Sequence, residues 1–333
     1  RKYLAELGVK QLEDIIGKTN YLYQLNELED YLKNIDLSPI LYSDFNNKES
    51  NFCKVSKNNP WDKADLSRKI LSDVKDIINK DKKGSFSYNI SNTDRSVGAN
   101  VSGEIASRYG EDGLSGSLNL NFMGSAGQSF GCWNANGLNI TLNGDANDYV
   151  GKGMNGGKII IKNDADFAIN DEKTILAGNT CLYGATGGEV YISGSVGERF
   201  AVRNSGAKAV IEGAGDHCCE YMTGGHVTIL GNVGLNFAAG MTGGFAYVLD
   251  EDRTFFDKCN RGLVGLERIT TEEMQPHRKH LKEILSNHYK YTNSKKAKEI
   301  IDDFDKFESH FWLVVPAATN IQDLLKATTA SAA

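Results

Sequence analysis

Short apolar strands recur along the middle of the chain at a nearly constant spacing. Five segments align without gaps: GGKIII (156–161), GGEVYI (187–192), GAKAVI (206–211), GGHVTI (224–229) and GGFAYV (243–248). Their first residues are separated by 31, 19, 18 and 19 positions (187−156, 206−187, 224−206, 243−224). A spacing of about 19 residues leaves room for turns only, because a βαβ unit needs ~30 residues or more. The pattern therefore predicts strands joined by short turns.

Two apolar files run through these segments. The first file contains Leu118, Leu138, Ile159, Val190, Ala209, Val227 and Ala246, and the second contains Leu120, Ile140, Ile161, Ile192, Ile211, Ile229 and Val248. The files lie two residues apart, so both point to the same face of a strand. Each coil would stack on the previous one at about 4.8 Å and bury its interior only against its neighbours. The fold class expected is mainly β, a parallel β-helix of about 19-residue coils with flanking α-helices.

The position between the two files faces the other way and varies: Asn119, Asn139, Ile160, Tyr191, Val210, Thr228 and Tyr247. Apolar and aromatic groups on an outward strand face are typical of a permanent interface. We therefore take Ile160, Tyr191, Val210 and Tyr247 as interface candidates. Their partner is either another domain or the flanks of this chain.

Glycine supports the same fold. The chain has 35 Gly and 4 Pro, and the glycines concentrate between about residues 98 and 244. Glycine is needed where the chain turns a tight corner with positive φ. The glycines expected at the corners are Gly156, Gly157, Gly187, Gly188, Gly206, Gly224, Gly225, Gly243 and Gly244. In the one long interval, the polar segment 163–173 is expected to leave its coil as an excursion.

The flanks are predicted to be largely helical. Residues 1–16 could place Leu4, Leu7, Leu12 and Ile15 on one face, and a helix is expected near 64–79. A helix over about 271–289 would turn Leu281, Ile284, Leu285 and His288 inward. Another over about 295–309, capped by Ser294, would do so with Ile300, Ile301, Phe304 and Phe307. The expected organisation is a terminal helix (1–20), a connector (21–90), the β-helix (91–252), a helical segment (253–318) and a tail (319–333).

Some short motifs suggest chemistry. Gly151-Lys152-Gly153-Met154-Asn155-Gly156 has the G-x-G-x-x-G spacing of a dinucleotide site, but a strand follows where that site requires a helix. Solenoid corner glycines are the favoured interpretation.

The run Asp216-His217-Cys218-Cys219-Glu220 contains metal-ligand residue types. In an extended strand, Asp216, Cys218 and Glu220 would share one side, and His217 and Cys219 the other. Interior filling and turn hydrogen bonds are the favoured interpretation.

Four basic residues could form a small surface for a flavin phosphate or an acidic partner: Lys162, Arg199, Arg203 and Lys208. A solvated face is the favoured interpretation.

Charge and cysteine content exclude several classes. The net charge is −6, and a basic stripe typical of nucleic-acid binding is missing from the sequence. The six cysteines, Cys53, Cys132, Cys181, Cys218, Cys219 and Cys259, show no C-x-x-C spacing. Reduced, buried thiols are therefore expected rather than a zinc ribbon or an iron–sulfur site.

Longer motifs closely resemble the C-terminal domain of glutamate synthase large subunits. They include NTDRSVGANVSGEIASRYGEDGL (92–114), LNGDANDYVGKGMNGG (142–157), ERFAVRNSGAKAVIEGAGDHCCEYMTGG (198–225) and NFAAGMTGGFAYVLDED (236–252). The N-terminal segment resembles the helix leaving the FMN-binding synthase domain, and 288–307 resembles the closing helical segment. The resemblance implies a right-handed β-helix that braces the other domains.

The same resemblance implies an activity for the whole enzyme. Glutamine, 2-oxoglutarate and two electrons give two glutamates, and FMN and a 3Fe-4S cluster lie in the synthase domain. It implies no catalytic, cofactor-binding or metal-binding residue in this chain. The implied partners are the amidotransferase and synthase domains, with a small electron-transfer subunit or domain as a further one. Neither nucleic acid nor membrane is an implied partner. The implied location is cytoplasmic, or organellar in a eukaryote.

Two other function classes use a β-helix of this general kind. One is an assembly subunit of a formylmethanofuran dehydrogenase-like complex, which uses a similar Gly-rich β-helix; the synthase-like flanks favour glutamate synthase instead. The other is a β-helix enzyme acting on polysaccharide. Such an enzyme needs clustered carboxylates on one face, and no file of this sequence is acidic.

Overall fold

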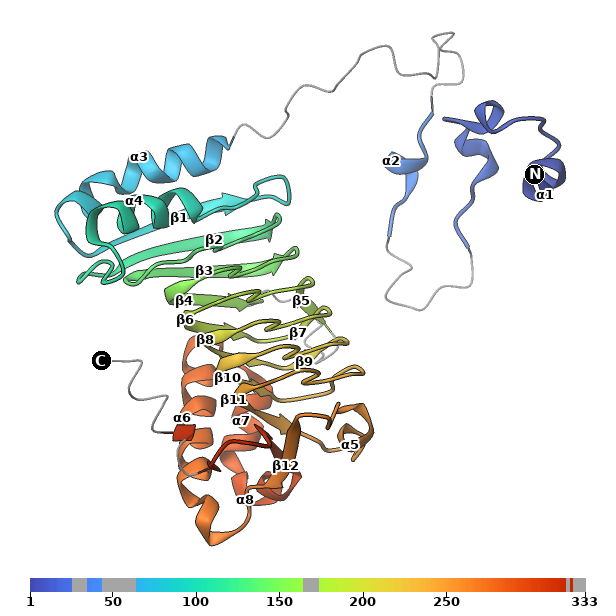
Figure 1. Ribbon diagram of the computed structural model, residues 1–333. Helices are drawn as coiled ribbons and strands as arrows, with labels where there is room; N and C mark the ends of the chain where they lie inside the picture. The colour runs from blue at the N-terminus through green and yellow to red at the C-terminus, as the bar shows by residue number, and fades with distance from the viewer. Residues whose placement is uncertain (26–34, 44–63, 164–173, 322–323, 326–333) are drawn as a thin grey trace. The chain divides into compact units, whose positions relative to one another are not determined.

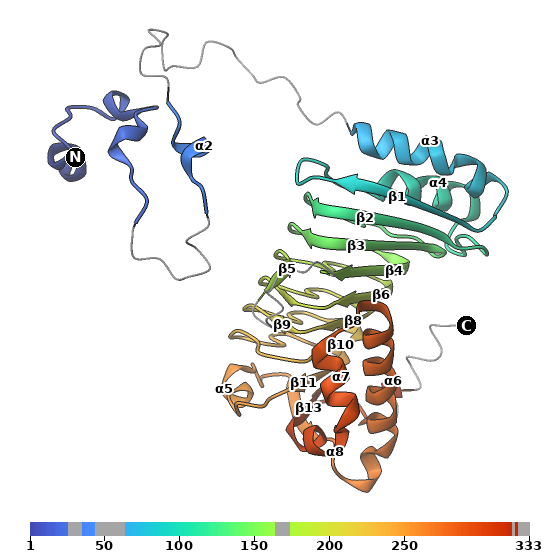
Figure 2. The same ribbon diagram turned by 180° about the vertical axis from the view of Figure 1, so that it is seen from behind.

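The computed structural model describes residues 1–25, 35–43, 64–163, 174–321 and 324–325 (Figures 1 and 2). The chain forms two compact units, Arg1–Trp61 and Asp62–Ala333. Cys53 and the expected excursion, apart from Asn163, lie outside the described residues. No helix in the described part of the chain is long and apolar enough to cross a membrane.

In residues 1–25 and 35–43, the described part of the first unit, the regular elements are short. This part contains helix α1 (Lys2–Glu6), two 3-10 turns (Leu12–Ile15 and Thr19–Tyr21) and helix α2 (Ser38–Leu41), and none of these elements buries a residue. The helix predicted over 1–16 therefore ends after Glu6. Gly8, with φ of 74°, is the physical reason, because a left-handed glycine just beyond the last turn stops a helix.

The second unit is a parallel β-solenoid of about 6 turns. One sheet stacks β1 (Gly84–Ile90), β2 (Leu118–Ala126), β3 (Leu138–Ala146), β4 (Asn155–Lys162), β6 (Gly187–Ile192), β8 (Ser205–Ile211), β10 (Thr223–Ile229) and β11 (Gly243–Leu249). From the end of β3, a second row of short strands runs beside it: β5 (Ile175–Ala177), β7 (Ser195–Val196) and β9 (Gly213–Ala214). Strand β1 lies in the segment expected as a connector, so the rod begins earlier than predicted.

The apolar files exist, but the predicted alignment of one strand was wrong by two residues. Ile140 pairs with Ile159, and Leu142 pairs with Ile161, where the sequence alignment had matched Leu138 and Ile140 to them. A shift of two keeps every side chain on its own face, so alternation alone cannot detect it. The corrected step from Ile140 to Ile159 is 19 residues (159−140), and Ile161, Ile192, Ile211 and Ile229 lie in one continuous core.

Helices and antiparallel strands cover the ends of the rod. Helix α3 (Asp65–Asn79) forms as predicted, and with α4 (Ala99–Tyr109) it packs Ile70, Val74, Ile78, Val101 and Ile105 into the core at the N-terminal end (Figure 1). After β11 come α5 (Phe255–Lys258), β12 (Val264–Arg268) and β13 (Phe311–Pro316). Strand β13 pairs antiparallel with both β11 and β12. Covering an end in this way protects the edge strand.

The helices after the rod lie along its side. Helix α6 (Gln275–Thr292) buries Leu281, Ile284, Leu285 and His288 as predicted, and each buried aliphatic group contributes about 1.5–3 kcal/mol. Ser294 caps α7 (Lys295–Asp302), but Asp303, with φ of −135°, separates α7 from α8 (Phe304–Phe307). The single helix expected over 295–309 is thus two. Strands β12 and β13 also fall inside the segment expected to be helical; the run FWLVVP is a short apolar strand.

Candidate interaction surface

Each of the six coils between β2 and β11 turns through a segment in which every second residue has a positive φ, between 53° and 68°. We call this the left-handed segment. Its positive-φ residues are Ser129, Gly131 and Trp133; Tyr149, Gly151 and Gly153; Thr180, Leu182 and Gly184; Arg199, Ala201 and Arg203; His217, Cys219 and Tyr221; and Asn236, Ala238 and Gly240. The G-x-G of the supposed dinucleotide motif is one instance of it, and strand β4 follows.

Backbone hydrogen bonds explain why this conformation repeats. The N–H groups of Arg199 and Arg203 donate to carbonyl oxygens in the next coil, at 2.8 and 3.0 Å. The N–H of Ala201, between them, donates 2.9 Å to the carbonyl of Cys181 in the previous coil. The left-handed segment thus pairs with both neighbouring coils, and this satisfies backbone groups that a loop would leave to water.

The corner glycines expected from sequence serve two different purposes. Gly157, Gly188, Gly225 and Gly244 have φ between 66° and 92°, as a corner requires. The other five do not have positive φ. At Gly187, Gly206, Gly224 and Gly243, an added Cβ would lie 2.0 to 2.5 Å from a carbonyl oxygen of the preceding coil, and at Gly156 it would meet the side chain of Asn136. Those five permit close approach between coils.

The side chains of the Asp216–Glu220 run do not converge on one point. Cys218 and Cys219 are both buried, with their Sγ atoms 3.8 Å apart, whereas alternation had placed them on opposite sides. The left-handed conformation of His217 and Cys219 is the reason, since alternation holds only in extended backbone. No group of three potential metal ligands occurs in the described ranges.

Burial also makes three of the described thiols poor nucleophiles. It raises the pKa of Cys181 and of Cys259 to about 12, and it raises that of Cys219 well above its ordinary value. A cysteine reacts as its thiolate, so these side chains serve as apolar filling. The five described cysteines are all free and buried.

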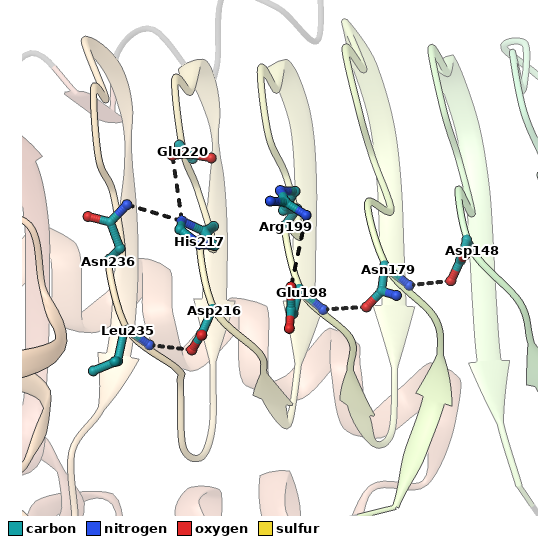
Figure 3. A network of polar contacts seen from close by, with 9 residues as sticks. All are labelled: Asp148, Asn179, Glu198, Arg199, Asp216, His217, Glu220, Leu235 and Asn236. Atoms are coloured by element: carbon teal, nitrogen blue, oxygen red, sulfur yellow. Dashed lines mark hydrogen bonds and ion pairs between the residues drawn. The ribbon is translucent and has the colours of Figure 1, made fainter. Parts of the chain in front are cut away.

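A polar ladder runs along the start of the left-handed segments (Figure 3). Asp148 Oδ1 accepts the N–H of Asn179 at 2.7 Å, and Asn179 Oδ1 accepts the N–H of Glu198 at 2.8 Å. Farther along, Asp216 Oδ1 accepts the N–H of Leu235 at 2.6 Å. Each side chain therefore holds the next coil in register. His217 Nδ1 lies 3.1 Å from Asn236 Nδ2 and 3.6 Å from Glu220 Oε1.

The outward position of the main sheet is covered by the chain itself. Ile160, Tyr191, Val210 and Tyr247 are 8%, 7%, 2% and 0% exposed and belong to a second core with α6, α7, α8 and β13. Of the two partners considered for these side chains, the C-terminal flank of this chain is the one that covers them. Farther toward the N-terminus, the paired outward residues Asn121 and Thr141 are polar and only partly buried. Where the helices cover it, the outward file is apolar except at Thr228, which is fully buried.

Two buried polar clusters join the C-terminal helices to the rod. Tyr247 Oη lies 2.8 Å from His277 Nδ1 and 3.3 Å from His280 Nδ1, and the ring of His280 meets that of His226. The second cluster centres on Glu212, whose carboxylate accepts the Ser294 hydroxyl and lies 3.4 Å from His288 Nε2. Both clusters lie inside packed structure.

The four basic residues do not form one surface. Lys162 and Lys208 belong to strands β4 and β8, while Arg199 and Arg203 are exposed in the left-handed segment. Sequence analysis also missed two exposed aromatic residues of that segment, Trp133 and Tyr221, which are 59% and 55% exposed. A period-two pattern carries no signal for them, because the segment is not a strand. Aligning the coils beyond the strands would have placed both in one file.

Comparison with known proteins identifies relatives with a shared name. The chain is 44% identical to "Ferredoxin-dependent glutamate synthase 2" of Synechocystis sp. over 95% of its length, and it covers 20% of that protein. It is 46% identical to the chloroplastic ferredoxin-dependent glutamate synthase of Spinacia oleracea, and 43% identical to the "Glutamate synthase [NADPH] large chain" of Bacillus subtilis. Both alignments again include 95% of this chain, and they cover 19% of the Spinacia oleracea protein and 21% of the Bacillus subtilis protein. The chain thus spans about a fifth of the length of these relatives.

A family model agrees with the fold. The family described as "GXGXG motif" matches residues 65–317, which begin at α3 and end just after β13. This range includes every coil and its left-handed segment. The chain therefore belongs to the GXGXG motif family.

Proposed function

We propose that this chain is the C-terminal structural domain of a glutamate synthase and braces the amidotransferase and FMN synthase domains. The observation that carries this proposal is 43–46% identity over 95% of the chain to glutamate synthases about five times as long. The continuous apolar core is consistent with a brace, since the rod is filled with side chains.

The first unit supports the proposal independently. Several of its large apolar side chains are strongly exposed, with Tyr3 at 77%, Tyr23 at 81%, Ile40 at 75% and Tyr42 at 76%. A short segment that exposes this much apolar surface is typical of an element that packs against another part of a larger protein. We infer that the described residues of this unit, 1–25 and 35–43, pack against the synthase domain.

The cofactors of the parent enzyme would lie outside this chain. The described residues do not fit an iron–sulfur cluster, because such a cluster needs several converging thiolates, whereas all five described cysteines are buried and burial raises the pKa of Cys181 and Cys259. We propose that FMN and the 3Fe-4S cluster are held by other domains. The chain's residues would then contribute rigidity and domain spacing rather than a chemical step. The compartment would be that of the parent enzyme: cytoplasmic, or an organelle in a eukaryote.

A domain exchange tests the proposal. The corresponding fifth of the Bacillus subtilis large chain would be replaced by this chain, and glutamine-dependent glutamate formation would be measured. We expect the exchanged enzyme to be active and this chain alone to be colourless and inactive. A matched exchange carrying Ile211→Asp, which places a charge in the core, should abolish activity. Flavin binding or glutamate formation by this chain alone would contradict the proposal.

A further inference from the structure

The last positive-φ position of each left-handed segment forms a file along the outside of the rod. We call it the outer left-handed file, and its members are Trp133, Gly153, Gly184, Arg203, Tyr221 and Gly240. At a coil spacing of about 4.8 Å, five steps make the file roughly 24 Å long. Three coils place glycine here, so the fold itself accepts glycine at this position.

The three larger residues adopt a backbone conformation that is unfavourable for them. The left-handed conformation costs a non-glycine residue about 1–2 kcal/mol. Trp133 and Tyr221 nevertheless remain 59% and 55% exposed, so burial offsets only part of this cost. Their rings lie over glycines of the next coil: an added Cβ on Gly153 would be 2.9 Å from Trp133 Cδ1, and one on Gly240 would be 2.5 Å from Tyr221 Cδ1.

Arg203 occupies the same file between these aromatic residues. Its side chain is exposed, and no ion pair or side-chain hydrogen bond joins it to another residue of the described ranges. Beside the file, Arg199 is 53% exposed with Glu198 at 3.9 Å, and Lys152 lies over the ring of Tyr149. Trp, Tyr and Arg are the residue types that contribute most binding energy at protein interfaces. Arg203 is thus a cation placed to meet a carboxylate.

We propose that the outer left-handed file is where the rest of the longer polypeptide docks on the rod, through a segment with a carboxylate at Arg203 and apolar groups at Trp133 and Tyr221. This proposal rests on the proposed function and names the face that it uses. Two observations select the occupant: the relatives are about five times longer than this chain, and the file combines unsatisfied positive charge with aromatic surface. The other candidate docking face, the outward side of strands β4 to β11, is already covered by α6.

Oxidative footprinting of the intact polypeptide tests this. Hydroxyl radicals modify exposed Trp and Tyr, and mass spectrometry would compare each residue in the native protein with the same residue in the urea-unfolded protein. Residues at the centre of an interface are shielded from solvent. We therefore expect Trp133 and Tyr221 to be oxidised about tenfold less in the native protein than side chains as exposed as theirs are in this chain. Tyr23 and Tyr42 should also be protected, because the proposed function buries them.

The outcomes separate the two proposals. Strong oxidation of Trp133 and Tyr221 with protection of Tyr23 and Tyr42 would overturn docking at this file and leave the proposed function intact. Strong oxidation of all four would overturn both.

Variants of the intact polypeptide test the file directly. Arg203→Gly removes the cation without disturbing a backbone that uses glycine in neighbouring coils. We expect it to raise the oxidation of Tyr221 about tenfold, a change that corresponds to the loss of a strong interface contact. The matched control is Arg253→Gly, which removes an exposed arginine of the same conformation, with φ of 59°, outside the file. Equal effects of both variants, or no effect of Arg203→Gly, would overturn the proposal.

Discussion

Glycine serves two separate purposes in this solenoid, and single positions distinguish them. Gly206 has ordinary φ, but an added Cβ would lie 2.0 Å from the carbonyl oxygen of Thr186. Gly184 has open space around the same atom, but its φ is 64°. Gly103, in α4, has neither constraint. The sequence shows all three simply as glycines, so only the coordinates separate steric need from conformational need.

Alanine substitutions should rank these glycines. We expect Gly206→Ala to lower the free energy of unfolding by about 2–3 kcal/mol, because backbone must move. Gly184→Ala should cost about 1–2 kcal/mol through its left-handed φ alone. Gly103→Ala should be neutral or stabilise by about 0.5–1 kcal/mol, as in any helix interior. Urea unfolding of the three variants measures the order, and a Gly206→Ala protein as stable as the wild type would contradict it.

Ser294 makes two contacts with one hydroxyl. It accepts the N–H of Ala297 at 2.9 Å at the start of α7 and donates to the buried carboxylate of Glu212. Ser294→Ala should therefore lower the free energy of unfolding by about 2 kcal/mol or more, from the lost cap and from the carboxylate that loses a donor. Ser286→Ala, at an exposed position of α6, is the matched control and should change little. Thermal unfolding measures both.

At the scale of elements, alternation predicted which face each strand buries but not its alignment with the next strand. The step between β3 and β4 differs from the predicted one by two residues, and both alignments keep Ile159 and Ile161 inside. The helices were predicted well where an apolar stripe runs along them, as in α3 and α6. The left-handed segments were missed because no side-chain period describes them. Trp133, Arg203 and Tyr221 therefore could not be recognised as one file.

The attachment of α6 should depend on pH. Burial lowers the pKa of His226 and His277, and it lowers that of His280 to about 4, with nearby charge on His277 and Lys208 adding to the effect on His280. Tyr247 also belongs to this cluster. Burial raises its pKa, so its hydroxyl stays neutral. Unfolded histidine titrates near 6.5. The unfolded chain therefore binds more protons than the folded chain below about pH 6.5, and stability falls as pH decreases toward 4.

Urea unfolding at pH 7 and pH 5 measures this dependence. Each histidine that stays neutral in the fold contributes a slope of at most about 1.4 kcal/mol per pH unit. His280→Gln should make the dependence shallower, whereas His310→Gln, at a half-buried position outside this cluster, should not. A wild-type stability that is constant between pH 7 and pH 5 would refute this assignment.

At the scale of the molecule, the rod is a stack in which each coil contacts its neighbours. Strand β1 pairs with β2 as β2 pairs with β3, so Gly84, Leu118 and Leu138 occupy equivalent places. Removing residues 118–137 joins Ser117 to Leu138 and should leave a shorter, folded rod with reduced stability. Removing only 118–127 should prevent folding, because it breaks both apolar files. Circular dichroism and size-exclusion chromatography distinguish these results, and equal folding of the two deletions would contradict the stack.

Helix α6 runs along the stacking direction of the strands, from Tyr247 on β11, which contacts His277, to Tyr191 on β6, which contacts Tyr291 (Figures 1 and 2). A helix rises about 1.5 Å per residue, and a coil adds about 4.8 Å to the rod. One extra coil beneath the helix would therefore have to be matched by about three extra helical residues. In the half of the rod that α6 covers, the number of coils and the length of this helix must therefore change together, a constraint that does not act on the N-terminal half.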